Sequence, residues 1–259
     1  MNAKKGKYKA AVSSDWSECL SPNGPFDPLA FTYPELESEL SHIFRQYTGN
    51  RISLTEATQR IKVLLPAPLT VTQMDEYLDR HFRTYRGVPE LIEWCASRDI
   101  LFMLNTTGTQ GYFQRASAKG LIPEIPLVAC NPLVQFTGES YPERYPCQVL
   151  EIEHKARCSQ QMLEAFGIPA ARLVVMGDSG GDGLHFKWAA GVGAFLIGSM
   201  IKQSLWNYCT DESITISHCF GLSYASGEPR DPEREMQVDF MHLTGIIEQA
   251  IAEKGNRTR

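Results

Sequence analysis

The chain has 259 residues, 43% of them apolar and 21% charged, and its 25 Lys and Arg against 30 Asp and Glu leave a net charge of −5. This is the composition of a packed protein, and its mildly acidic balance argues against nucleic acid or an anionic membrane as a partner, since both bind basic surfaces. No apolar run reaches the roughly 18 residues that a membrane span needs. The seven scattered Cys contain no C-x-x-C pair and indicate reduced thiols in the cytoplasm.

Short apolar runs alternate with segments of helical periodicity along most of the chain. Such alternation predicts an α/β fold, with a doubly wound, mostly parallel sheet covered by helices on both faces. The expected strands are residues 8–14, 100–104, 125–130, 173–176, 193–197 and 213–217, and the expected helices between them include 88–98, 155–166 and 238–253.

The stretch from Pro22 to Arg86 breaks this alternation, because it contains helical patterns and no convincing strand. Helices are expected over 35–47, from Ser53 to about 65, and from Thr70 to 82; Thr32–Glu35 and Ser53–Glu56 have the spacing of capping boxes. We therefore predict a core domain of residues 1–21 and 87–259 and a helical cap of residues 22–86, inserted after the first strand. The charged segment 221–239 is expected to be a solvated loop.

Polar residues gather where the predicted strands end, which is where open α/β sheets bind their ligands. Three carboxylates, a hydroxyl group and an ammonium group are expected to meet at this edge: Asp15 after the first strand, Thr106 after the second, Asp178 and Asp182 around the fourth, and Lys155 at the start of the preceding helix. An ionised Asp is able to attack phosphorus. Carboxylates that hold Mg²⁺ would offset the repulsion between two anions, and Lys155 and Thr106 would hold the transferring oxygens.

These residues resemble the four motifs of the haloacid dehalogenase-like (HAD) superfamily of hydrolases. Asp15–Cys19 falls on its D-x-D-x-T motif, Thr106 on its Ser/Thr motif, Lys155 on its Lys motif, and Gly177–Asp182 on G-D-x-x-x-D. The resemblance implies that Asp15 is the nucleophile and a Mg²⁺ ligand, that the Ser17 carbonyl and Asp178 are further ligands, and that Asp182 supports the metal or orients Lys155. It also implies a Rossmann-like core with a C1-type cap and a small phosphorylated substrate.

Ser17 departs from the family pattern at an important place. The family's phosphatases carry an Asp there, which protonates the leaving alcohol and later activates water, and a hydroxyl group is a poor general acid near neutral pH. Phosphatase activity through an aspartyl-phosphate on Asp15 is the main expectation. Two alternatives stay open: C–P bond hydrolysis resembling that of phosphonoacetaldehyde hydrolase, assisted by Lys62 of the cap, and a catalytically impaired HAD-like binding protein.

Several other residues have simple structural interpretations. His185 and Cys19 are expected to pack in the interior, Trp16 to pack at the junction of cap and core, and Arg45, Arg51 and Arg60 to be solvated on the cap. Neither the substrate nor the oligomeric state is readable from the sequence.

Overall fold

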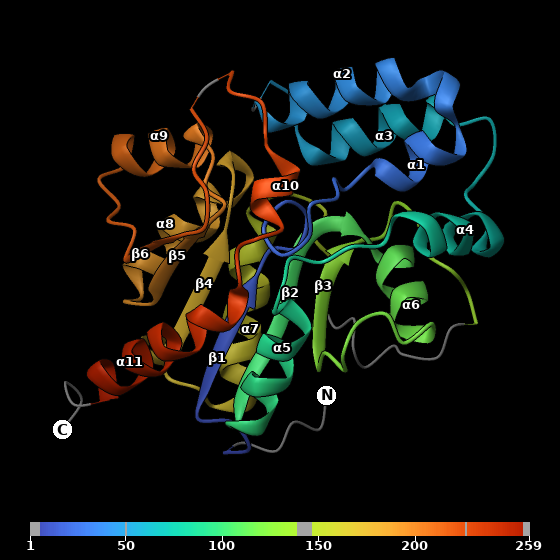
Figure 1. Ribbon diagram of the computed structural model, residues 1–259. Helices are drawn as coiled ribbons and strands as arrows, with labels where there is room; N and C mark the ends of the chain where they lie inside the picture. Colours follow the sequence, from blue (N-terminus) through green and yellow to red (C-terminus); the bar gives the residue numbers. More distant parts are fainter. Residues whose placement is uncertain (1–5, 50, 139–146, 226, 256–259) are drawn as a thin grey trace.

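The computed structural model describes residues 6–49, 51–138, 147–225 and 227–255, which fold around one six-stranded parallel sheet (Figure 1). The strand order is β3-β2-β1-β4-β5-β6. β1 (Ala10–Ser14) pairs with β2 (Ile100–Thr109) on one side and with β4 (Leu173–Gly177) on the other. The chain therefore winds outward in both directions from β1, which confirms the predicted doubly wound fold and places a topological switch point beside β1.

The central strands are apolar on both faces because helices cover both faces. Every residue of β1, β4 and β3 (Leu127–Asn131) is buried. β5 (Phe195–Ser199) and β6 (His218–Phe220) complete the sheet. Continuous apolar runs of this kind are typical of buried parallel strands, which is why the sequence pattern located most of them.

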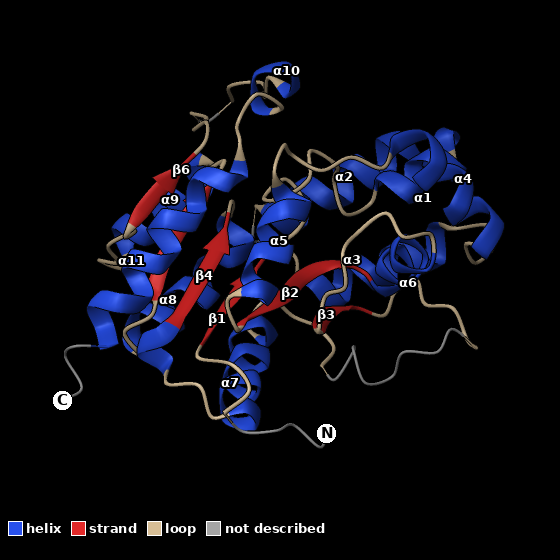
Figure 2. Ribbon diagram, turned by 60° about the horizontal axis from the view of Figure 1, so that its bottom comes forward, coloured by secondary structure: helices blue, strands red, loops and turns tan. Residues whose placement is uncertain are grey.

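Helices lie on the two faces of the sheet (Figures 1 and 2). α5 (Val88–Ser97) and α11 (Leu243–Gly255) contact each other on one face, and α7 (His154–Phe166) and α8 (Gly183–Gly191) contact each other on the other. α6 (Gln110–Ala118) packs against β2 and β3, and α9 (Gln203–Asp211) packs against α8. These contacts bury the apolar stripe of each helix against the sheet or a neighbouring helix.

Between β1 and α5 the chain forms four α-helices, which we call the helical insert: α1 (Asp27–Thr32), α2 (Glu37–Thr48), α3 (Leu54–Leu64) and α4 (Val71–His81). They lie at the carboxyl ends of the strands in Figure 1. An ion pair joins α4 to α6, where Arg115 Nε and Nη2 donate to the two oxygens of Asp75 at 2.8 and 2.9 Å. On the other side, the Glu151 carboxylate accepts the Leu54 and Thr55 N–H groups at the start of α3.

The helix starts in the insert agree in part with the predicted capping boxes. Thr70 and Gln73 form a full capping box at α4, and Ser53 accepts the N–H of Glu56 at α3. The predicted box at Thr32 is wrong, since the Thr32 hydroxyl donates to the Pro28 carbonyl inside α1. A 3-10 turn over Pro34–Leu36 leads into α2 instead. Pro34 favours that turn, because its ring fixes φ at a helical value.

Two strands differ from the prediction. Residues 213–217, expected to be a strand, form the turn after α9, where Ser213 has a φ of 55° and the Ile214 N–H donates to the Cys209 carbonyl. Ile214 and Ile216 alternate with polar residues only because they pack on the sheet edge from a loop. β2 runs five residues beyond the predicted end, so Thr106 lies within this strand, at an irregularity between Asn105 and Thr109.

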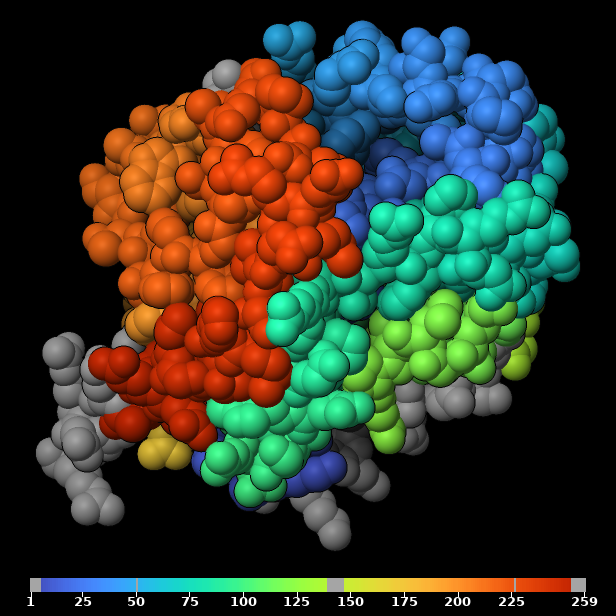
Figure 3. All heavy atoms as spheres, in the orientation of Figure 1, coloured from blue at the N-terminus to red at the C-terminus, as the bar shows by residue number. Residues whose placement is uncertain are grey.

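The prediction that the charged segment 221–239 is a solvated loop is wrong, because the middle of the segment is packed against the protein. Arg230 is half-buried, Glu235 in the short helix α10 (Pro232–Glu235) is fully buried, and the two form an ion pair. This orange-red segment lies beside the blue N-terminal part in Figure 3. Charged residues in a stretch without apolar periodicity do not reveal such pairs, so composition alone predicted exposure.

No helix in the described ranges is long and apolar enough to cross a membrane. All seven Cys are free thiols.

Candidate functional site

Asp15 stands at the carboxyl end of β1, at the switch point of the sheet. Its N–H donates to the Met176 carbonyl of β4 at 3.1 Å, so the backbone after the strand is held between two strands. The carboxylate is 7% exposed and accepts the Trp16 N–H on Oδ1. Its Oδ2 accepts from Lys155 Nζ at 2.8 Å.

Lys155 reaches Asp15 from the first turn of α7 and is itself 1% exposed. Its ammonium group contacts Asp15 Oδ2 at 2.8 Å and Asp182 Oδ1 at 2.6 Å. Asn105 donates to the Lys155 carbonyl, and also to Ser159, whose hydroxyl is bonded to His185. A buried polar network thus fixes the start of α7 below the carboxylates.

Asp178 and Asp182 come from the loop between β4 and α8. Asp182 Oδ2 accepts the Asp178 N–H at 3.0 Å, which folds the loop back on itself. A Cβ at Gly177 would lie 2.5 Å from Asp182 Cγ, so only glycine fits there. The sequence GDSGGD therefore has a steric reason as well as a chemical one.

The three aspartates have the donor set of a hard divalent cation. Oxygen atoms of Asp15, Asp178 and Asp182 lie within 4.8 Å of one another, and all three residues are buried. Both oxygens of Asp182 already accept hydrogen bonds, from Lys155 and from the Asp178 N–H. Both oxygens of Asp15 accept hydrogen bonds as well, from the Trp16 N–H and from Lys155. Asp178 Oδ2 accepts no hydrogen bond from a described residue and only pairs with the charge of Lys202, so Asp178 is the carboxylate most open to a metal. Carboxylate oxygens of this kind fit Mg²⁺.

Burial and charge act against each other at these groups. Burial raises the pKa of Asp15 despite Lys155, and it raises that of Asp178 to about 7 despite Lys202. Although burial opposes it, the pair of carboxylates around Lys155 raises the pKa of that ammonium group, which stays protonated. A concentration of negative charge held away from water is the environment that favours a bound cation.

Thr106 and Ser17 lie beside the carboxylates. The Thr106 hydroxyl accepts the Gly108 N–H at 3.1 Å, and it lies close enough to Asp15 to oppose the rise in the pKa of that carboxyl. A Cβ at Gly108 would lie 3.4 Å from the Thr106 hydroxyl oxygen and 3.7 Å from that of Ser17. The structure therefore brings all six residues of the predicted site, including these two, to one edge of the sheet.

Three charged residues beside the site were not predicted. Glu18 forms ion pairs with Lys202 and with Arg230, and Lys202 Nζ also lies 2.7 Å from Asp178 Oδ2. Lys202 follows β5 directly, so extending the search of strand ends to the fifth strand would have found it. Arg230 had no such signal, because it lies in the segment that looked solvated.

The helical insert also reaches the site through Tyr47 of α2. A Cβ at Gly181 would lie 3.7 Å from its hydroxyl group, and Thr107 and Lys155 are near enough to affect the pKa of the phenol. Burial raises the pKa of this phenol despite the nearby Lys155. In the sequence, Tyr47 was only one apolar position of a predicted helix. The helical pattern shows that its ring is buried, but not where its hydroxyl group lies.

Aromatic residues line the junction between the insert and the site. Trp16 contacts Phe82, Tyr112 and Phe113, with ring centroids 5.7 to 6.4 Å apart. Trp16, Ser17 and Tyr112 help to line a small cavity with about 10 Å³ of free space, room for one water molecule. The expectation that Trp16 packs at this junction is confirmed.

The remaining residues singled out in the sequence lie away from the carboxylates. Cys19 and His185 are buried, as expected, and Arg45, Arg51 and Arg60 are exposed. Lys62 is exposed on α3 and lines a groove with residues 65–69 and 133–135. A larger groove of about 830 Å³ between α2 and α3 contains none of the predicted site residues, so size does not mark the site.

Comparison with known proteins finds similarity in structure only. No family model and no curated protein matches the chain. A phospho-aspartyl intermediate analogue of phosphoserine phosphatase aligns with a TM-score of 0.64 and 16% identity, over 92% of this chain and 99% of that one. A substrate-bound phosphoserine phosphatase aligns at 0.64 and 15%, over 92% and 98%. A HAD family hydrolase from Salmonella enterica serovar Typhi aligns at 0.59 and 12%, over 82% and 68%. The chain therefore has the fold of these hydrolases.

Proposed function

We propose that the chain is a Mg²⁺-dependent HAD-type hydrolase that acts on a small phosphorylated metabolite through an aspartyl-phosphate on Asp15. One observation carries this proposal: Asp15 lies at the switch point, bonded to Lys155, with Asp178 and Asp182 in reach of a shared cation. Structural ion pairs rarely need three buried carboxylates at one strand edge, because burying each charge is costly. The likeness to phosphoserine phosphatases supports the same chemistry.

Each residue then has a role that follows from its contacts. The Asp15 carboxylate attacks phosphorus, and Lys155, which contacts Asp15, and the nearby Thr106 hydroxyl stabilise the charge on the transferring oxygens. Asp182 holds Lys155 in place. Asp15, Asp178 and the Ser17 carbonyl would hold Mg²⁺, which supplies positive charge that lowers the repulsion between the nucleophile and the phosphoryl group.

The helical insert serves in this proposal as the cap, with residues 22–86 as a separate unit from the core of residues 1–21 and 87–259. Tyr47 supports this role, because it places a side chain of the insert beside Thr107 and Gly181. A cap of this kind excludes water and contacts the part of the substrate beyond the phosphoryl group.

Turnover of a panel of phosphorylated compounds with Mg²⁺ tests the proposal. We expect Asp15→Asn to lower kcat at least 1000-fold while the protein still folds, since the amide has the same shape but does not attack phosphorus. The exposed Asp79→Asn in α4 is a matched control and should keep its activity. Equal turnover by wild type and Asp15→Asn would refute the role of Asp15, and no turnover by wild type would favour the binding protein.

The structure gives no support to Lys62 as a second catalytic group. Its side chain is exposed, and it lines a groove to which none of the three site aspartates contributes. A Schiff base requires an unprotonated amine, which a solvated lysine rarely provides at neutral pH. We therefore propose no C–P bond hydrolysis.

A further inference from the structure

Ser17 occupies a special position for proton transfer. It comes two residues after Asp15, and its hydroxyl group lies on the same side of Gly108 as that of Thr106. In the HAD pattern on which the proposed function rests, the residue at this position protonates the oxygen that leaves when the nucleophilic aspartate attacks a phosphate ester. An aliphatic hydroxyl holds its proton too tightly to give it to that oxygen at neutral pH.

Glu18, the carboxylic acid closest in sequence, is committed elsewhere. Lys202 Nζ binds its Oε2, and Arg230 Nη1 binds its Oε1, so both oxygens act as acceptors. Lys202 contacts Asp178 as well, and Arg230 contacts Glu235. Releasing Glu18 to donate a proton would break two ion pairs that are shielded from water.

The other titratable groups around Asp15 are committed in the same way. Asp182 accepts from Lys155 on one oxygen and from the Asp178 N–H on the other. Lys155 donates to two carboxylates. The Tyr47 phenol faces Gly181, and burial raises its pKa further from neutrality. Asp178, whose pKa burial raises to about 7, pairs with Lys202 and is the carboxylate proposed to hold the metal, which would keep it ionised. Among the described residues, these groups around Asp15 thus serve charge and position.

We infer that, if the proposed hydrolase function holds, the substrate is a phosphoryl compound with a weakly basic leaving group: an acyl phosphate, a phosphoric anhydride or an aryl phosphate. As the bond from an Asp15 oxygen to phosphorus forms, the bond to the leaving oxygen breaks. Its electron pair departs on a carboxylate, phosphate or phenolate. None of these needs a proton to be stable in water, whereas an alkoxide does.

The presence of a hydroxyl group instead of a carboxyl group at Ser17 also affects the second step. Hydrolysis of the aspartyl-phosphate adds water to phosphorus, returns the Asp15 carboxylate and releases one proton, which a general base normally accepts. The Ser17 hydroxyl is not such a base. The phosphorylated chain therefore accumulates before it is hydrolysed.

A leaving-group series tests the first step. Wild type with Mg²⁺ is assayed on p-nitrophenyl, phenyl and ethyl phosphate, and acetyl phosphate is added as the acyl substrate. We expect kcat/KM to fall at least about 1000-fold from p-nitrophenyl to ethyl phosphate, since a general acid contributes about 100- to 10000-fold. Rates on ethyl and p-nitrophenyl phosphate within tenfold of each other would overturn the inference.

Two substitutions at one position separate acidity from shape. Ser17→Asp should raise kcat/KM for ethyl phosphate at least about 100-fold and change p-nitrophenyl phosphate much less. Ser17→Asn has nearly the same size as Asp without the acid, and should bring no gain on ethyl phosphate. An equal gain in both variants, or none with Asp in a folded protein, would overturn the inference.

Rapid mixing tests the second step and separates the two proposals. Wild type should release about one equivalent of p-nitrophenolate per chain in a burst, with phosphate trapped on Asp15 by acid quench. Ser17→Asp should shorten the life of this species at least tenfold. If wild type turns over the alkyl ester rapidly without a burst, this inference fails while the hydrolase stands. If no substrate gives turnover or label, the proposed function fails too.

Discussion

Lys202 places a positive charge beside the carboxylates of the site. Its ammonium group lies 2.7 Å from Asp178 Oδ2 and also binds Glu18. A divalent cation at Asp178 would therefore meet a positive charge only a few ångströms away. The lysine is partly exposed, so it is able to turn toward Glu18 and the solvent when a metal arrives.

We expect Lys202→Met to bind Mg²⁺ at least tenfold more tightly than wild type, because the substitution removes like charge and keeps most of the apolar stem. Isothermal titration calorimetry on the folded proteins measures the difference directly. Lys187→Met is the matched control, since Lys187 is an exposed lysine whose partner is Glu212. An unchanged or weaker affinity in Lys202→Met would show that Lys202 does not compete with the metal.

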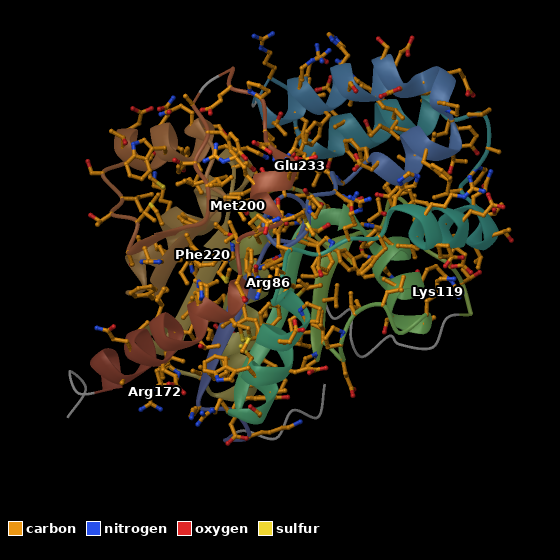
Figure 4. All side chains as sticks on the ribbon, viewed as in Figure 1. Arg86, Lys119, Arg172, Met200, Phe220 and Glu233 are labelled. Atoms are coloured by element: carbon orange, nitrogen blue, oxygen red, sulfur yellow. The ribbon has the colours of Figure 1, made fainter. Side chains whose placement is uncertain are left out.

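The segment around α10, in the C-terminal part of the chain, is joined to the loop that follows β1. Figure 4 shows it, with Glu233 labelled, above the sheet and near the helical insert. Arg230, just before the helix, pairs with Glu235 and with Glu18, and the Tyr85 hydroxyl donates to Glu235 at 2.8 Å. Residues more than 140 positions apart in sequence thus share one buried network.

Removing the cation from this network should cost stability. Arg230→Met leaves the buried Glu235 carboxylate without its counter-ion, and we expect the free energy of unfolding to fall by about 2 to 3 kcal/mol. Arg234→Met, an exposed arginine on the same helix, should change it by less than about 0.5 kcal/mol. Urea denaturation measures both, and similar values for the two variants would refute a structural role for the Arg230 pair.

The stability of the whole molecule should depend on pH through His185. Burial lowers the pKa of this imidazole to about 3 in the folded protein, against about 6.5 when it is exposed. Below pH 6.5 the unfolded chain therefore takes up a proton that the folded chain does not. Stability from this group is present above pH 6.5 and is lost as the pH falls toward 3.

Wild type should accordingly lose roughly 1.4 kcal/mol per pH unit more than His185→Gln between pH 6 and pH 4. Denaturant titrations at pH 7, 6, 5 and 4 provide the slopes. His42→Gln removes an exposed histidine and should keep the wild-type slope. If His185→Gln also keeps that slope, the imidazole is protonated in the folded protein.

Local patterns in the chain were enough for the parallel sheet, the helical insert and the six residues at the strand ends. Buried strands and amphipathic helices repeat over a few residues, and the carboxyl ends of parallel strands always meet at one edge. That is why the sequence alone predicted that Asp15, Asp178 and Lys155 lie close together.

The ion pairs of Glu18, Lys202 and Arg230, the reach of Tyr47 and the burial of Glu235 required the three-dimensional structure. Each depends on where a charged or polar tip points after distant segments have packed, and no local period encodes that direction. Whether Asp182 binds a metal or orients Lys155 is a question of the same kind. Its two oxygens are already engaged, and that becomes visible only when the loop has folded back.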